Sequence, residues 1–82
     1  MNEPTRPMTF GEMACGVSFN PDNNNDVDNI KRAFALLVDD LHDRRLKAGL
    51  LEKKETVRML SIAITELQTA QMWAVKAVTW KF

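Results

Sequence analysis

The sequence has 82 residues with 11 basic and 11 acidic side chains, so its formal net charge is zero and no overall field recruits DNA, RNA or an anionic membrane. No apolar run is long enough for a transmembrane helix, and the polar residues 1–7 lack the pattern of a secretory signal peptide. The single cysteine, Cys15, excludes an intramolecular disulfide, so we expect one small soluble domain over residues 1–82 in a reducing cytoplasm.

Residues 1–25 have the composition of a loop. They contain all three prolines, two of the three glycines and the run Asn23 to Asn25, which favour turns. Their apolar side chains are too many for a free tail, namely Phe10, Met13, Val17 and Phe19. We therefore expect a loop-like N-terminal arm that lies against the rest of the protein.

Residues 26–48 are predicted to form the first long helix, because their apolar side chains recur at three- and four-residue steps along one side. Asn25 or Asp26 can cap its start. The apolar row consists of Val27, Ile30, Phe34, Leu37 and Leu41. Gly49 is predicted to end the helix, since glycine readily adopts the left-handed conformation found after many helices.

The other side of this helix is charged. Asp40 and Arg44 have the spacing of a helical ion pair, so we expect a solvated surface. This surface carries Asp39, Asp40, His42, Asp43, Arg44, Arg45 and Lys47. His42 is the only histidine, and no cysteine lies three or four residues from it. We therefore predict no metal site, no catalytic residue, no cofactor and no enzyme activity.

The second long helix is predicted over residues 52–80 and carries two apolar rows, whereas a surface helix normally has one. The first row runs through Val57, Leu60, Ile64, Leu67, Gln71, Ala74 and Val78. The second row places alanines beside two tryptophans and runs through Met59, Ala63, Glu66, Ala70, Trp73, Ala77 and Trp80. We infer two packing partners for this helix.

A short connection between two long helices predicts an all-α fold, an antiparallel two-helix hairpin with an ordered N-terminal arm. The first row of the second helix would then face the first helix. The second row would stay in water in a single hairpin, so we expect a homo-oligomer without a stable monomer. The predicted subunit interface comprises Ala70, Trp73, Ala77 and Trp80.

Polar side chains interrupt the second helix, and two interpretations stay open. These residues are Ser61, Thr65, Gln68, Thr69, Gln71 and Thr79. Their hydroxyl groups could bond back to backbone carbonyls of the same helix, or the polar groups could line a pocket between subunits with Lys76, Lys81 and the arm. Phe19 and Lys31 favour the pocket, because an aromatic that stacks on a base and a lysine that meets a phosphate suit a small nucleotide.

Several short motifs together resemble a known family. They are Phe10-Gly11-Glu12, Gly16-Val17-Ser18-Phe19-Asn20-Pro21, Ile30-Lys31 and Met72-Trp73-Ala74-Val75-Lys76. Through these motifs most of the chain resembles the small phage hairpin proteins of the anti-CBASS cyclic-nucleotide sponge family. The same hairpin is similar to one shared with the phage sponges that counter Thoeris defence.

The resemblance implies a function. Members of the family assemble from hairpins into oligomers, commonly hexamers, and sequester the cyclic di- and trinucleotides that activate CBASS effectors, without cleaving them. The expected partners are therefore cyclic di- or trinucleotides and further copies of the chain, in the cytoplasm of an infected bacterial host.

The resemblance also implies site residues. The family's dinucleotide pocket uses an aromatic of the arm and a lysine of the first helix, which map onto Phe19 and Lys31. Its trinucleotide pocket uses a threonine two residues beyond that lysine, where this sequence has Ala33. It also uses an arginine near the end of the second helix, where Lys76 and Lys81 are nearest. This departure favours cyclic dinucleotides as ligands.

The resulting hypothesis places cyclic nucleotides where subunits meet, under arms of residues 8–21 that act as lids. Phe19 would stack on a base, and Lys31 would compensate phosphate charge. Ser18 and Asn20 would offer hydrogen bonds to base or ribose edges. The predicted ligand-binding residues are Phe10, Ser18, Phe19, Asn20, Pro21, Lys31, Lys76 and Lys81.

A different class of function accounts equally well for the second apolar row: a structural helical oligomer or adaptor that binds a partner helix. It leaves the apolar arm and Lys31 unexplained. A DNA-binding helical dimer is disfavoured, because the basic residues form no continuous stripe and the net charge is zero.

Overall fold

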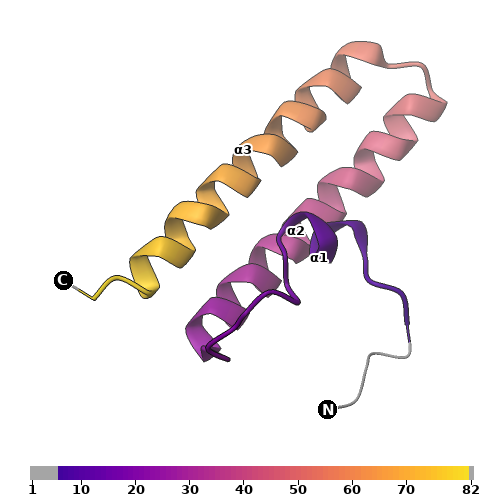
Figure 1. Cartoon of the computed structure of the whole chain (residues 1–82). Coiled ribbons are helices and arrows are strands. Elements are labelled where there is room, and N and C mark those ends of the chain that lie inside the picture. The colour runs from indigo at the N-terminus through magenta and orange to yellow at the C-terminus, as the bar shows by residue number, and fades with distance from the viewer. Residues whose placement is uncertain (1–5, 82) are drawn as a thin grey trace.

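The computed structural model describes residues 6–81, and every regular element in this part of the chain is a helix. The helices are α1 (Phe10–Ala14), α2 (Asn25–Leu50) and α3 (Lys54–Val78). Figure 1 shows α2 and α3 side by side and antiparallel, with the segment that carries α1 lying against α2. The all-helical prediction and the packing of two long helices against each other are confirmed.

The short helix α1 was not expected, because the arm has the composition of a loop. A capping box starts it: the Thr9 hydroxyl accepts a hydrogen bond from the Glu12 amide, and the Glu12 carboxylate accepts one from the Thr9 amide. These two bonds satisfy backbone donors that the first turn of a helix leaves free. The spacing of threonine and glutamate is a sequence signal for this start that the composition of the arm obscures.

The start of α2 lies one residue earlier than predicted. Its N-cap is Asn24, whose side-chain oxygen accepts a hydrogen bond of 3.1 Å from the Val27 amide, so neither Asn25 nor Asp26 caps the helix. An asparagine at this position can take a β-region backbone and supply the acceptor. Because three asparagines follow one another here, the sequence does not indicate which of them caps the helix.

The end of α2 corrects the prediction for Gly49, which lies inside the last turn and does not stop the helix. The left-handed residue is Glu52, with a φ of 58°. Around it the Glu52 amide donates to the Gly49 carbonyl and the Lys53 amide donates to the Ala48 carbonyl. This pair of bonds is a Schellman motif, which closes a helix most easily when glycine occupies the left-handed position.

The polar residues of α3 support the first of the two interpretations given above. The hydroxyls of Ser61, Thr65, Thr69 and Thr79 all donate to the carbonyl four residues earlier in the same helix. Such back-bonding satisfies a hydroxyl without a ligand. Gln71 is buried on the side that faces α2, and the Gln68 amide donates to the Ala14 carbonyl of the arm at 3.3 Å.

One hydrophobic core is shared by the arm, α2 and α3. Its buried residues are Cys15, Val17, Ala35, Val38 and Ile64, with Met8, Ala14, Phe34, Leu41 and Leu67 packed around them. Ile64 belongs to the first apolar row of α3, as predicted. The predicted row of α2 is confirmed in part, because Val27 is buried and Phe34 and Leu41 pack against the core, while the arm covers a neighbouring part of that helix. Leu37 is exposed, whereas Lys31, Ala35 and Val38 are buried.

The molecule is thin. Its Cα atoms span 46 × 34 × 13 Å, so the smallest dimension is less than a third of the largest. A protein of this shape has little interior, so many apolar side chains stay at its surface. No helix among residues 6–81 is long and apolar enough to cross a membrane.

Candidate ligand-binding site

Lys31 connects α2 to the turn that ends the arm. The side chain is only 7% exposed, and its ammonium group donates hydrogen bonds to the carbonyls of Gly16, at 3.0 Å, and Phe19. The ammonium nitrogen also lies 5.4 Å from the centre of the Phe19 ring. A buried lysine needs such acceptors, since an unpaired charge in this place would be costly. The two residues of the predicted dinucleotide pocket are thus in direct contact.

The backbone of the turn has a conformation that depends on glycine. Gly16 has a φ of 61°, which L-residues with a side chain rarely adopt, and the Phe19 amide donates to the Gly16 carbonyl at 2.9 Å. The turn directs the Phe19 ring outward, where it is 70% exposed. An exposed ring held by a bonded turn can stack on a planar base without further ordering of the backbone.

A hollow of about 130 Å³ lies beside this turn, between the start of α2 and the end of α3. It is lined by Phe19, Asn20, Pro21, Asp22, Asn24, Val27, Lys31, Val75 and Thr79. Small-molecule sites usually enclose roughly 300–1,000 Å³, so this hollow by itself is smaller than a cyclic dinucleotide needs. In a single chain, the hollow therefore forms only part of a site for a ligand of that size.

The structure brings four of the predicted ligand residues together at this hollow: Phe19, Asn20, Pro21 and Lys31. The Asn20 side chain is already committed to the loop, because its amide donates to the Asn24 carbonyl and its oxygen accepts from the Asn24 amide. These two bonds close the loop before α2, and Asn20 also lines the hollow. Each group uses one bond here, so a second N–H and a second lone pair of Asn20 remain, and its role as a ligand contact stays a prediction.

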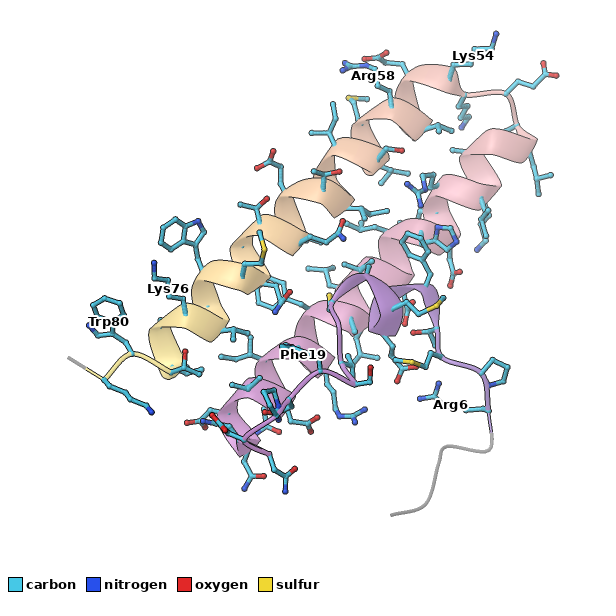
Figure 2. The ribbon with its side chains drawn as sticks, in the orientation of Figure 1. Arg6, Phe19, Lys54, Arg58, Lys76 and Trp80 are labelled. Atoms are coloured by element: carbon cyan, nitrogen blue, oxygen red, sulfur yellow. The ribbon has the colours of Figure 1, made fainter. Side chains whose placement is uncertain are left out.

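The other four predicted ligand residues lie elsewhere. The Phe10 ring stacks on His42, and Ser18 is exposed outside the lining of the hollow. Lys76 lies over the rings of Trp73 and Trp80, at 5.2 and 5.9 Å, and Lys81 is exposed after the end of α3. Figure 2 shows Phe19 on the side of α3 that faces α2, and Lys76 and Trp80 on the opposite side.

Four lining residues were missed by the sequence analysis, namely Asp22, Asn24, Val27 and Val75, whereas Thr79 was among the polar residues that could line a pocket. Val27 was predicted only as a core position, although it sits in the first turn of α2, where that helix meets the arm. Val75 and Thr79, the C-cap of α3, are four residues apart and so lie on one face of that helix and its end. The four-residue spacing of these two residues is the signal that the sequence offers. It shows that they share one side of the helix, but it does not show that this side borders a hollow.

The charged side of α2 is partly covered by α1, which corrects the prediction of a solvated surface. The Asp39 carboxylate accepts a hydrogen bond of 2.7 Å from the Gly11 amide. His42 stacks on Phe10 with ring centres 4.2 Å apart, so this histidine is not simply exposed to solvent. Arg45 lies over the same phenyl ring at 5.3 Å. Only the outer part of the charged side behaves as expected, with Asp40 and Arg44 paired at 3.1 Å.

Two pKa shifts describe the arm. A bidentate hydrogen bond from Arg6, followed by one from the Thr9 amide, lowers the pKa of Glu12 to about 2. Burial raises the pKa of the Cys15 thiol, which keeps it protonated and makes it a poor nucleophile. Among residues 6–81 no group of three or more histidine, cysteine or acidic side chains could hold a metal ion.

The outer side of α3 is apolar and exposed. Trp73 is 66% exposed, and Trp80, Met59, Ile62 and Met72 are also largely accessible. Further apolar side chains are exposed on α2 and at the hairpin connection, namely Leu36, Leu37, Leu46, Leu50 and Leu51. A monomeric protein rarely leaves so many large apolar groups in water, so these surfaces are candidates for contacts with other chains.

A family model described as Acb2/Tad1, hairpin domain, matches residues 13–79, which is most of the chain. The chain belongs to this family. The match contains the turn, the hollow and both long helices of the Acb2/Tad1 hairpin, and it begins inside α1. No curated protein and no solved structure matches the chain.

The Acb2/Tad1 family is associated with the sequestration of cyclic oligonucleotides, and its hairpin is a binding domain and not a catalytic one. The geometry of this member agrees with that description, since the described residues around the hollow offer a ring and an ammonium group. An exposed ring and a lysine are groups that hold a base and a phosphate.

Proposed function

We propose that this protein binds and sequesters cyclic oligonucleotide second messengers, with cyclic dinucleotides as its preferred ligands. In the cytoplasm of an infected bacterium this would block activation of CBASS effectors, and the ligand would be held without being cleaved. The observation that carries the proposal is the match of residues 13–79 to the Acb2/Tad1 hairpin domain.

Phe19 and Lys31 are the proposed ligand contacts. The Phe19 ring would stack on one base. The Lys31 ammonium has three donors, and two of them are used by the carbonyls of Gly16 and Phe19, which leaves one for a phosphate oxygen. A partly buried ammonium is screened less by water than an exposed one, so its attraction to a phosphate is stronger. Ala33 stands where the resemblance implies a threonine for trinucleotides, which favours the smaller ligands.

A second copy of the chain would complete the site. A hollow of about 130 Å³ is too small for a cyclic dinucleotide, while the exposed ring of Phe19 leaves one side of the site open. We propose a homo-oligomer, a hexamer, with Ala70, Trp73, Ala77 and Trp80 in a subunit interface. The support for this interface is the exposure of all four residues on the outer side of α3.

Isothermal titration against a panel of cyclic dinucleotides and trinucleotides tests the ligand assignment. Wild-type protein is expected to bind at least one cyclic dinucleotide, and Lys31→Ala and Phe19→Ala are expected to weaken binding by roughly tenfold or more. The matched control is Lys54→Ala, which removes an exposed lysine at the other end of the hairpin in Figure 2. Unchanged affinity in both site variants would remove Phe19 and Lys31 from the pocket.

The nucleotide content of the purified protein separates this proposal from a structural adaptor. Protein isolated from bacteria that synthesise cyclic nucleotides is expected to carry a small molecule absorbing near 260 nm, which denaturation releases and mass spectrometry identifies. An adaptor that binds a partner helix through the tryptophan side of α3 would release none and would bind no member of the panel.

A further inference from the structure

A group of contacts holds α1 against α2, and we call it the α1 clasp. It consists of Phe10 and Gly11 on α1 and of Asp39, His42 and Arg45 on α2. The Asp39 carboxylate accepts from the Gly11 amide, Phe10 stacks on His42, and an Arg45 amino group lies 2.8 Å from the His42 Nδ1 atom. Arginine can only donate, so the Nδ1 atom accepts this bond.

The clasp joins all three helices through Arg45. Besides its contacts with Phe10 and His42, the Arg45 guanidinium donates to the Ser61 hydroxyl of α3 at 3.2 Å. The Ser61 hydroxyl in turn donates to the Val57 carbonyl, so the chain of hydrogen bonds ends on the backbone of α3. A linked set of bonds of this kind has few alternative arrangements, which keeps α1 in one position.

The position of α1 is transmitted to the ligand site by the backbone. The Cys15 amide donates to the Gly11 carbonyl and the Val17 amide donates to the Glu12 carbonyl, both at 3.0 Å. Cys15 and Val17 are buried in the core, so the segment between them has little freedom. The next bond is that of the Phe19 amide to the Gly16 carbonyl, and it belongs to the turn that Lys31 holds. No flexible linker separates the clasp from Phe19.

We propose that Asp39, His42 and Arg45 are positioning residues for the ligand site. They touch no part of the hollow, and they act through α1 by fixing the turn that presents Phe19 to a base. Loss of the clasp would not remove the side chains of Phe19 and Lys31. The turn would be less ordered in the free protein, so the ligand would have to order it on binding and its affinity would fall. The expected loss of ligand affinity rests on the proposed function, whereas the expected loosening of the turn does not.

Hydrogen exchange without ligand tests the structural half of this inference. Asp39→Ala removes the acceptor of the Gly11 amide, and we expect exchange of the Phe19 amide to become roughly tenfold faster or more. Asp40→Ala is the matched control, because Asp40 is the neighbouring carboxylate and, among residues 6–81, pairs with Arg44 on the outer side of α2. Asp39→Asn keeps an acceptor oxygen and is expected to fall between wild type and Asp39→Ala. An unchanged Phe19 amide in folded Asp39→Ala and Asp39→Asn protein would overturn the inference.

Titration with the cyclic dinucleotide that binds wild type best tests the functional half. Asp39→Ala is expected to lose roughly tenfold or more in affinity, and Asp40→Ala is expected to lose nothing. In protein that already carries Phe19→Ala, the Asp39→Ala change should cost little more, since the residue through which it acts is gone. Additive losses, or faster exchange with unchanged affinity, would show that Asp39 does not position the site. A wild-type protein that binds no cyclic nucleotide would contradict the proposed function instead, and the exchange result would still decide whether the clasp controls the turn.

Discussion

Gly11 packs so closely against Ala35 that a β-carbon added to the glycine would lie 2.1 Å from the Ala35 carbonyl oxygen. The same added atom would lie 2.8 Å from the Asp39 carboxylate that bonds the Gly11 amide. The obstacle is mainly backbone, which cannot move aside as the end of a flexible side chain can. α1 can therefore lie directly on α2 only because residue 11 is glycine.

Substitution of Gly11 by alanine is expected to detach α1. We expect the free energy of unfolding to fall by about 3 kcal/mol, the upper end of the usual cost of overpacking, or the arm to leave α2 while the hairpin stays folded. Chemical denaturation followed by circular dichroism measures the first result, and protease sensitivity of the arm measures the second. Gly49→Ala is the matched control, because no atom outside the local helix lies within 4 Å of the added β-carbon there. It should be neutral or stabilise α2 by up to about 1 kcal/mol.

The left-handed backbone of Glu52 leads to a stabilising substitution. With a φ of 58° this residue is in a conformation that costs an L-residue roughly 1–2 kcal/mol and that glycine adopts freely. Glycine also adds freedom to the unfolded chain, so we expect Glu52→Gly to raise the free energy of unfolding by about 0.5–1 kcal/mol net. Glu52→Ala removes the same carboxylate but keeps the unfavourable φ. If both variants change stability equally, the charge and not the backbone is responsible.

The two long helices were predictable because the information for them is local. Apolar side chains at helical spacing define each helix, and the row containing Ile64 was correctly assigned to the contact with α2. The Gly49 prediction failed because a glycine near a helix end is only one way to close it, and the backbone here places Glu52 in the left-handed position. The capping box of Thr9 and Glu12 was a local signal for α1, but the contacts that hold this helix in place involve residues such as Ala35 and Asp39 that are distant in the sequence.

The ligand site was predictable only in part. Phe19 and Lys31 were paired by their chemistry and by the family resemblance, and they are in contact. Nothing in the sequence indicates that the Lys31 ammonium also bonds two carbonyls of the arm. Asp39 and His42 were interpreted as part of a solvated surface, since charged residues on a helix usually face water. A short segment folding over them cannot be inferred from periodicity within the helix.

Glu12 makes docking of the arm sensitive to acid. Its hydrogen bonds to Arg6 and to the Thr9 amide lower its pKa from 4.5 to about 2. A carboxyl group with a lowered folded-state pKa contributes stability above its unfolded pKa and loses that contribution as the pH falls through its folded pKa. We therefore expect the stability of wild type relative to Glu12→Gln to decrease between pH 4.5 and about 2.

The control for this pH dependence is the glutamine variant itself. Glutamine can fill the same place in a capping box but has no proton to gain in this range, so it isolates the charge of Glu12. Thermal unfolding of both proteins at several pH values between 2 and 6 measures the difference. A constant difference across this range would show that the ion pair with Arg6 does not persist in solution.

Assembly through the outer side of α3 depends on Trp73. This side chain is 66% exposed in the protomer and does not belong to the hydrophobic core, so its replacement leaves the core intact. We expect wild-type protein to have a native mass several times that of the 9.4 kDa protomer, measured by light scattering after size-exclusion chromatography. Trp73→Glu should shift the protein to smaller species while retaining its helical circular dichroism, because it replaces a large apolar anchor by a carboxylate that is costly to bury in an interface. Trp73→Phe keeps a large apolar ring and should remain assembled. Assembly of Trp73→Glu equal to that of wild type would exclude this side of α3 as the subunit interface.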